Sequence, residues 1–507
     1  MAAEFSARLH ASSSVAALAC TTLLALPWLW PYTPGPSPNV VPLLVAWTCG
    51  LLAALAIATA ARPADLLETT ASRAWLAAAL VSAVIGVLQW FDLAPRTPLV
   101  SLAQIGEAYG NLRQKNQFAS LTAIGLAVLV FRRVPLAPAP ALAAVLLLAI
   151  GNALSASRTG LVEWMALTVL AAAWPGPRKG RVALCVAGLA GYILAGALLP
   201  LLLAWWRGAD ALNVFVRVST ELGCSSRKVL WSNVAELIAA KPWTGWGWGE
   251  LDYAHYATLY DGERFCNILD NAHNLPLHLA VEFGLPAAVL ATALLAVAVL
   301  RAKPWRDADP ARQLAWAVLA VVGLHSLVEY PLWYGPFQWA VLLAVALLVR
   351  VPALSPPRRG ATAAGVALAL VALALMAREY DTVSQAYLQP AERRPTMRAD
   401  PVRAAGTPLL FRSQLEFAEL SVTPVTDRSA RHVHDLALRM LHYSPEPGVI
   451  EKLAESALLL GRSDEVAWLV PRYQAAFPDD YAKWQLRELA LSTLDKASPE
   501  RPDGLAR

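Results

Sequence analysis

Long apolar runs recur along most of this chain, and they constrain its fold more than any other feature. Each run is about 17 to 25 residues long, which is enough to cross a bilayer core of about 30 Å as a helix. The runs lie at 12–30, 39–60, 74–91, 116–131, 136–154, 159–174, 182–204, 274–300, 313–329, 336–350 and 361–377. Because 57% of the residues are hydrophobic and only 16% are charged, the pattern predicts an all-α polytopic membrane protein with about eleven transmembrane helices.

Basic clusters between the runs predict the orientation of the chain. The segments "PGPRKGR", "RAKPWRDADPAR" and "VPALSPPRRG" fall on every second side, and loops rich in Lys and Arg stay in the cytoplasm. An odd number of spans then places the tail outside, in the periplasm of a Gram-negative bacterium. We expect a multi-pass inner-membrane protein with a transmembrane domain (1–377), a large periplasmic loop (205–273) and a periplasmic helical domain (378–507).

Composition and motifs disfavour several classes of function. The net charge of +5 arises from short, scattered clusters, so no nucleic-acid partner is expected. No P-loop or dinucleotide-binding fingerprint occurs, which disfavours an ATP-driven transporter. The one Asp-x-Asp pattern that suits a divalent cation, Asp307 to Asp309, falls in a predicted cytoplasmic loop. We therefore expect a reaction without a metal or another cofactor.

The stretch "NAHNLPLHLAVEFGLP" (271–286) places polar groups at the mouth of an apolar run. Ionisable groups at membrane depth are costly and usually mark a functional path. His273, followed by Asn274, is the candidate general base, because an imidazole accepts protons near neutral pH; the acceptor substrate would be a hydroxyl. His278 and Glu282 share one helical face, either as a pair that orients the site or as a structural contact between helices.

Other polar segments fall on the same predicted outer side. They are "YGNLRQKNQFAS" (109–120), "SASRTG" (155–160) and "EYPLWYGPF" (329–337). The last segment follows His325, which is four residues before Glu329 and so repeats the spacing of the first His–Glu pair. Polar groups gathered on one face indicate a site there and do not line a path through the bilayer.

The predicted outer loop combines cationic and aromatic residues. Arg227 offers a planar fork of donors that suits the oxygens of a pyrophosphate, and a lipid-linked pyrophosphate would fit. Juxtamembrane cations also anchor proteins to lipid headgroups, and that interpretation of Arg227 stays open. The turn "TGWGWGEL" (244–251) is likewise either an interfacial anchor or a surface on which sugars stack.

Two of the five cysteines predict a disulfide. Cys224 and Cys266 lie in the same outer loop, whereas Cys20, Cys49 and Cys185 fall within apolar runs. An oxidising periplasm would pair the two loop cysteines, with two unpaired thiols as the alternative.

The tail after residue 377 is charged and has apolar positions at helical spacing. A break at Gly461 separates two helices, so the unit resembles a tetratricopeptide-like hairpin. His432 and His434 lack further metal ligands nearby, and we expect both to be surface residues. The tail either presents an acceptor to the site or braces the long loop.

Five motifs occur in order: "LRQKNQFAS", "SASRTG", "RKVLWSNVAELIAAKPWTGWGWGEL", "AHNLPLHLAVEFGLP" and "HSLVEYPLWYGPF". Together they resemble the O-antigen ligase/polymerase (Wzy/WaaL-like) superfamily, and within it the bacterial protein O-oligosaccharyltransferases of the PglL type. The resemblance covers roughly 100–507 and implies a GT-C-like membrane fold. It further implies transfer of a preassembled glycan from undecaprenyl pyrophosphate, in the membrane lipid, to a Ser or Thr hydroxyl of a periplasmic acceptor such as pilin.

The resemblance also assigns roles to individual residues. His273 matches the essential loop histidine, and Arg227 opens the long-loop motif. With Arg158, Arg227 is expected to stabilise the departing pyrophosphate in a direct, inverting displacement. Residues expected to handle donor or acceptor are Gln114, Lys115, Asn116, Asn274, His278, Glu282, Tyr330 and Tyr334.

Other activities stay open. An O-antigen ligase that attaches the glycan to lipid A core, or an O-antigen polymerase, would share the donor and His273 and differ in the acceptor. A transporter of the lipid-linked glycan is a more distant alternative. A covalent glycosyl-enzyme route would need a carboxylate nucleophile, for which Glu282 is the nearby candidate.

Overall fold

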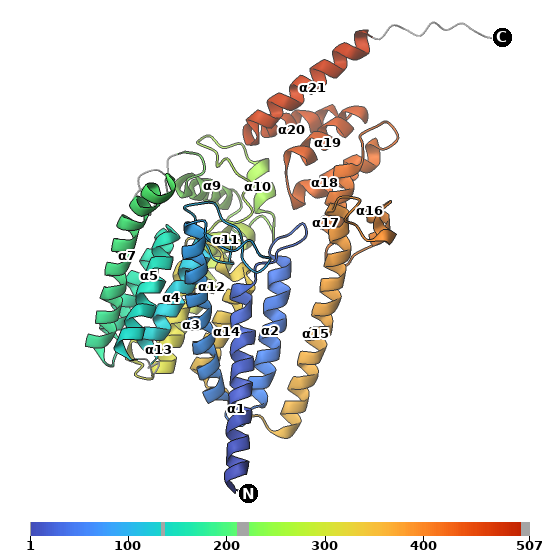
Figure 1. Ribbon diagram of the computed structural model, residues 1–507. Coiled ribbons are helices and arrows are strands. Elements are labelled where there is room, and N and C mark those ends of the chain that lie inside the picture. Colours follow the sequence, from blue (N-terminus) through green and yellow to red (C-terminus); the bar gives the residue numbers. More distant parts are fainter. Residues whose placement is uncertain (1, 133–136, 210–222, 498–507) are drawn as a thin grey trace, which may run out of the picture. The chain divides into compact units, whose positions relative to one another are not determined.

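The computed structural model describes residues 2–132, 137–209 and 223–497, and every regular element within these ranges is a helix (Figure 1). The chain divides into two compact units. The first comprises Met1–Glu221, His273–Leu275 and Thr292–Ser384, and the second comprises Leu222–Ala272, Pro276–Ala291 and Gln385–Arg507. The boundary therefore differs from the linear division at residue 377, because most of the outer loop groups with the tail. Residues 210–222 of that loop lie outside the described ranges.

The first unit is a bundle of apolar helices. Its members are α1 (Ala2–Ala25), α2 (Val40–Thr59), α3 (Pro63–Trp90), α4 (Lys115–Phe131), α5 (Pro138–Leu154), α6 (Arg158–Ala173), α7 (Arg178–Arg207), α13 (Pro310–Ser326), α14 (Gly335–Val349) and α15 (Pro356–Ser384). In the described residues, five segments are long and apolar enough to cross a membrane: Val40–Thr59, Pro63–Trp90, Arg178–Arg207, Leu285–Arg306 and Pro356–Tyr387. The chain is thus a polytopic membrane protein, and the count of eleven crossings stays a prediction.

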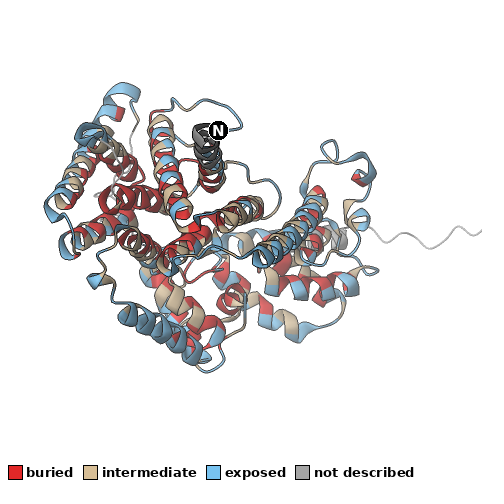
Figure 2. Cartoon of the chain, turned by 90° about the horizontal axis from the view of Figure 1, so that it is seen from below, coloured by how far each residue is buried: buried red, intermediate tan, exposed pale blue. Residues whose placement is uncertain are grey.

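Helix α4 is the centre of the bundle. Every residue from Gln117 to Phe131 is buried, and α3, α5, α6 and α13 pack around it. Small residues allow close approach: a Cβ on Gly125 would lie 2.7 Å from the Cβ of Ala79, which is typical of helix packing in lipid. Figure 2 shows buried residues on the facing sides of the helices and exposed residues on the outer sides.

The apolar run at 274–300 forms two helices rather than one. Helix α11 (Leu275–Phe283) ends before Gly284, and α12 (Leu285–Ala302) begins after it. Gly284 has a φ of +86°, and a Cβ there would lie 2.3 Å from the carbonyl oxygen of Trp243. The expectation of one continuous helix is wrong here, because the backbone of the Gly-Trp turn occupies the space beside this break.

The second unit joins the loop to the tail. The loop contributes α9 (Arg227–Ala240) and α10 (Leu251–Ala257). The tail contributes α16 (Pro401–Ala405), α17 (Arg412–Val422), α18 (Ala430–Tyr443), α19 (Pro447–Leu459), α20 (Ser463–Ala476) and α21 (Pro478–Ala497). Gly461, with a φ of +73°, separates α19 from α20 as the sequence predicts. The tetratricopeptide assignment stays a prediction.

Helix α10 is part of the hydrophobic core of the tail. Tyr256 is buried in that core, and its hydroxyl donates to the carbonyl of Leu469 at 3.3 Å. Arg472 donates to the carbonyl of Ala257 at 2.8 Å, and the ring of Tyr253 stacks on His442 at 3.8 Å. These contacts support a bracing role for the tail.

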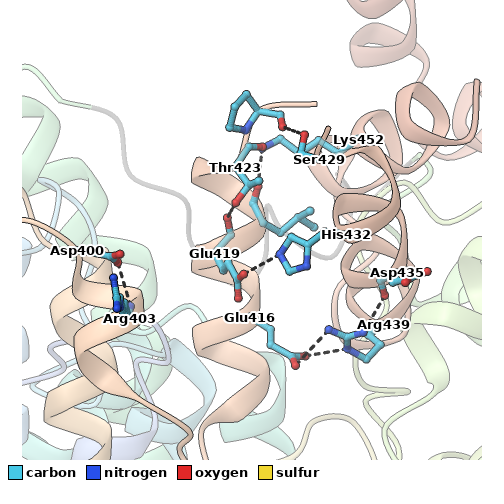
Figure 3. Close-up of polar contacts among 12 residues, drawn as sticks. Asp400, Arg403, Glu416, Glu419, Thr423, Ser429, His432, Asp435, Arg439 and Lys452 are labelled. Carbon is cyan, nitrogen blue, oxygen red and sulfur yellow. Dashed lines mark hydrogen bonds and ion pairs between the residues drawn. The ribbon is translucent and has the colours of Figure 1, made fainter. Parts of the chain in front are cut away.

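The two tail histidines differ in environment. His432 is exposed and contacts Glu419 at 2.8 Å, close to the Glu416–Arg439 pair (Figure 3). His434 is fully buried, and its Nε2 lies 2.6 Å from Glu465. The expectation of two surface histidines is wrong for His434, because α18 turns this position toward the neighbouring helices.

Candidate active site

Three of the sequence motifs place a polar cap at the start of a helix. Gln114 caps α4, Ser157 caps α6 and Ser226 caps α9, each by accepting a hydrogen bond from a backbone N–H of the first turn. Such caps satisfy donors that a helix leaves unpaired. The first helical residues are Lys115, Arg158 and Arg227. Each cation therefore sits where the helix dipole already favours an anion.

The backbone is strained at the same motifs. Arg113, directly before the cap of α4, has a φ of +59°, and Ala156, directly before the cap of α6, has a φ of +50°. His273 also has a φ of +50°. Non-glycine residues in the left-handed region cost about 1–3 kcal/mol each and cluster at functional sites.

A hydrogen-bonded network in the first unit joins four motif residues, and we call it the outer network: His273, Glu329, Asn116 and Ser157. The Nδ1 of His273 lies 2.7 Å from Oε2 of Glu329. Asn116 donates to the other oxygen of Glu329 at 3.2 Å, and it accepts from the hydroxyl of Ser157 at 2.7 Å. Gly160 permits this approach, since a Cβ there would lie 2.6 Å from the Cβ of Ala119.

The contact with Glu329 determines which ring nitrogen of His273 can accept a proton. A carboxylate oxygen accepts, so the Nδ1–H of His273 donates, and in the neutral ring the lone pair lies on Nε2. The side chains of His273 and Glu329 are 18% and 10% exposed, so the pair is accessible without being open to bulk solvent. This arrangement orients the His273 ring as a candidate base.

Aromatic residues flank the base. The ring of Tyr330 meets that of His273 edge-on at 4.9 Å, and Tyr334 stacks on Tyr330 at 5.9 Å. Asn274 donates to the carbonyl of Leu327 at 2.9 Å, which ties the chain after His273 to the segment before Glu329. These motif residues therefore gather around His273.

Sequence reasoning missed three residues that build the site. Glu329 was noted only for its spacing from His325, whereas the structure pairs it with His273. Gln89 accepts from the backbone of Tyr109 and Gly110, and Asn111 donates to two carbonyls, those of Leu29 and Leu99. Together they fix the segment that leads into α4. The sequence signal for Gln89 was an amide within the apolar run at 74–91, whereas Asn111 lies in the polar segment at 109–120.

Two predicted handling residues near α4 have local partners. The side chain of Gln114 accepts from the backbone N–H of Gln117 at 2.6 Å, and Lys115 contacts Glu107 at 2.7 Å. Gln114 is therefore a helix cap in this structure, and Asn116 is the member of the trio that reaches Glu329.

His278 and Glu282 lie together in the second unit, 3.5 Å apart and both buried. Glu282 accepts from the backbone N–H of Gly249 at 2.9 Å, and its own carbonyl accepts from Gly247 at 3.0 Å. The pair therefore helps to hold the Gly-Trp turn in place. Trp248 of that turn is 78% exposed, which is compatible with either interpretation of the turn.

Helix α9 contacts the later part of the same loop, from Glu263 to Ala272. Trp231 donates to the carbonyl of Ala272 at 3.1 Å, directly before His273. Asn233 exchanges hydrogen bonds with the backbone of Glu263 and Phe265. The structure joins Cys224 to Cys266 by a disulfide, with Cα atoms 5.4 Å apart, which ties the start of α9 to the same returning segment.

Burial shifts the pKa of two ionisable groups of α10 toward their neutral forms. Burial raises the pKa of Asp252 to about 7, and burial, assisted by Arg264, lowers the pKa of His255 to about 3. His255 donates through Nε2 to the carbonyl of Phe265 at 3.0 Å and accepts through Nδ1 from the hydroxyl of Tyr260 at 2.8 Å. These contacts fix the loop and reach none of the outer network.

Asp307 and Asp309 have structural partners. Asp307 pairs with Arg312 at 2.6 Å, and Asp309 caps α13 and contacts Arg350. Within the described ranges, no three His, Cys, Asp or Glu side chains converge as a metal site.

Comparisons with known protein families match three segments of the chain. A model for protein glycosylation ligases matches residues 108–132, and one for O-antigen ligases matches 143–292. A model for the C-terminal part of membrane-bound polymerases described as virulence factors matches 313–490. The three matches contain Asn116, then Ser157 and His273, then Glu329, so every member of the outer network falls within a family match.

Two curated relatives are similar over much of the chain. A general O-oligosaccharyltransferase of Acinetobacter baylyi is 24% identical over 335 residues, which is 62% of this chain and 56% of that protein. An O-antigen ligase of Pseudomonas aeruginosa is 30% identical over 281 residues, which is 54% of this chain and 61% of that protein. The matched part thus spans less than two thirds of either relative.

The fold and the outer network define a polytopic membrane protein with a His–carboxylate pair at the ends of its helices. The family matches and relatives specify it further. The chain belongs to the superfamily of O-antigen ligases and protein O-oligosaccharyltransferases.

Proposed function

We propose that the protein transfers a preassembled glycan from undecaprenyl pyrophosphate to Ser or Thr hydroxyls of periplasmic proteins such as pilin. It would act at the outer face of the inner membrane. The observation that carries this proposal is the pairing of His273 with Glu329 at 2.7 Å, which orients a base for a hydroxyl. The match to protein glycosylation ligases at 108–132 favours a protein acceptor.

The proposed reaction is one in-line displacement. Nε2 of His273 takes the hydroxyl proton as the acceptor oxygen bonds to the anomeric carbon, and the bond from that carbon to the pyrophosphate oxygen breaks. The anomeric configuration inverts. Negative charge develops on the leaving pyrophosphate. Arg158 and Arg227 would stabilise this charge, because fixed cations act most strongly in the transition state. No residue needs to form a covalent intermediate, and Glu282 is already engaged with Gly249.

O-antigen ligation is the second candidate. The ligase relative has the higher identity, 30% against 24%, and the donor and base would be the same. The acceptor would then be lipid A core. An O-antigen polymerase would use a second lipid-linked glycan.

A competition experiment tests these assignments. Purified protein reconstituted in sealed liposomes receives a lipid-linked oligosaccharide together with a pilin-like protein, lipid A core and a second lipid-linked glycan. We expect glycan on Ser or Thr of the protein. Transfer to lipid A core alone would assign the protein as a ligase, and translocation without transfer would assign a transporter.

The role of Arg227 is tested in the same assay. Arg227→Ala should weaken use of the donor strongly, and Arg227→Lys should rescue it only in part, because Lys lacks the planar fork. Full rescue by Lys would indicate a headgroup anchor instead.

A further inference from the structure

Three buried polar side chains connect the helices that carry the outer network, and we call them the inner layer: Ser120, Glu163 and His325. Ser120 of α4 donates to Oε1 of Glu163 on α6 at 2.6 Å. The same hydroxyl oxygen lies 2.8 Å from Nδ1 of His325 on α13. Since Ser120 has given its hydrogen to Glu163, His325 donates its Nδ1–H to Ser120. All three residues are 0% exposed.

Two members of the inner layer lie one helical turn from members of the outer network. Asn116 and Ser120 are four residues apart on α4, and so share one face of that helix. His325 and Glu329 are also four apart, and the backbone N–H of Glu329 donates to the carbonyl of His325 at 2.9 Å. On the third side, the cap of α6 supplies Ser157 to the outer network, and Glu163, six residues later in α6, belongs to the inner layer. A residue of α4 therefore stands at the centre of both layers.

Packing alone does not explain the inner layer. Oε2 of Glu163 and Nε2 of His325 have no hydrogen-bond partner in the described residues. A buried polar atom without a partner is unfavourable, and apolar side chains of similar volume would avoid this cost. Buried polar groups of this kind call for a role beyond cohesion.

We propose that Ser120, Glu163 and His325 are positioning residues that set the register of α4, α6 and α13. By doing so they hold Asn116 and Glu329 in place, so that the carboxylate of Glu329 accepts hydrogen bonds from both Asn116 and His273. The proposal rests on the proposed function of His273 as a base. The inner layer touches no substrate and exchanges no proton with His273.

Paired substitutions separate positioning from ionisation. Glu163→Gln keeps an oxygen that accepts from Ser120, whereas Glu163→Leu removes it. His325→Asn keeps a donor near the Nδ1 position, whereas His325→Leu removes it. Ser120→Ala removes the central hydroxyl. Thr122→Val is the matched control on α4, because Thr122 is equally buried and bonds to Asn152 of α5 and to its own helix.

The expected result is a split between kcat and KM. Ser120→Ala and the two Leu variants should lower kcat of folded protein roughly 10- to 100-fold, the scale of a small misplacement of reacting groups, with the KM for the lipid-linked donor unchanged. Glu163→Gln and His325→Asn should restore most of that loss, and Thr122→Val should leave kcat unchanged. On a Glu329→Ala background, Ser120→Ala should have no further effect.

Three outcomes would overturn the proposal. Glu163→Gln as slow as Glu163→Leu would mean that ionisation matters. A kcat loss in Thr122→Val equal to that in Ser120→Ala would mean general destabilisation. Additive losses in the Ser120→Ala/Glu329→Ala double variant would mean that the layer does not act through Glu329.

A second measurement needs no turnover. The rate at which diethylpyrocarbonate modifies His273, followed by mass spectrometry, should change in the same direction in Ser120→Ala and Glu329→Ala and stay unchanged in Thr122→Val. An unchanged rate in Ser120→Ala contradicts the proposal even if the wild type transfers glycan to none of the offered acceptors. The proposed function and the inner layer therefore fail by different observations.

Discussion

Two His–Glu pairs begin five residues apart in this chain, and they are built in different ways. His278 and Glu282 are four residues apart on α11, buried, with nitrogen and oxygen 3.5 Å apart. His273 and Glu329 are 56 residues apart, partly exposed, and 2.7 Å apart. Helix periodicity makes the first pair, whereas tertiary structure makes the second. Only the second pair is partly exposed, and its spacing in the sequence does not predict the contact.

Substitution of the two histidines is the strongest test of this difference. His273→Ala should lower turnover by about 10²–10⁴, the usual contribution of a general base. His278→Ala is the matched control, and we expect its loss per folded molecule to be smaller by at least about tenfold, because His278 contacts Glu282, which holds the Gly-Trp turn in place. Transfer rates on detergent-purified, monodisperse protein measure both. Wild-type-like turnover in His273→Ala would rule out the proposed base.

Removal of the disulfide tests whether the second unit is chiefly a scaffold. Cys224→Ser with Cys266→Ser opens a loop of 42 residues, and the chain-entropy model predicts a loss of roughly 3–4 kcal/mol of stability. Thermal unfolding in detergent, compared with Cys49→Ala as an unpaired-cysteine control, measures the effect. Unchanged melting in the double variant would contradict a stabilising bridge.

Amide variants of the two glutamates compare the pairs at constant shape. Glu329→Gln removes the charge that faces His273, and since hydrogen bonds to charged groups contribute about 1.5–3 kcal/mol, we expect kcat to fall by roughly 10- to 100-fold. Glu282→Gln keeps an oxygen for the N–H of Gly249 and should turn over at close to the wild-type rate. Equal losses in both variants would abolish the distinction between the pairs.

The smallest expected effect concerns pH and the second unit. The pKa of Asp252 is raised to about 7 in the folded protein from an ordinary value of 3.8, so the folded state holds a proton that the unfolded state has lost. Its contribution to stability is therefore complete below about pH 4 and is lost as pH rises through about 7.

Asp252→Asn should remove this dependence. Relative to the wild type, the variant should gain several degrees in melting temperature between pH 4 and pH 8, and its Oδ1 still accepts from the backbone N–H of Tyr253. The opposite trend of His255, which favours unfolding as pH falls below about 6.5, is common to both proteins and cancels in the difference. An identical pH trend in variant and wild type would show that Asp252 titrates normally.

The sequence by itself determined the helical class, the position of most helices and the candidate base. Apolar runs of membrane length admit few alternatives, because backbone groups in lipid must be satisfied within a helix. Gly461 predicts a helix end from its own chemistry, so this local feature follows from neighbouring residues alone.

Only the tertiary structure decided the partners of these residues. The contact of Glu329 with His273, the grouping of the long loop with the tail through Tyr256, and the break at Gly284 against Trp243 all join segments far apart in the chain. No local pattern encodes such contacts, since they depend on how helices pack and on where the backbones approach. The candidate His273–Glu329 pair is therefore a property of the fold, while the His278–Glu282 pair, four residues apart on α11, is a property of helix geometry.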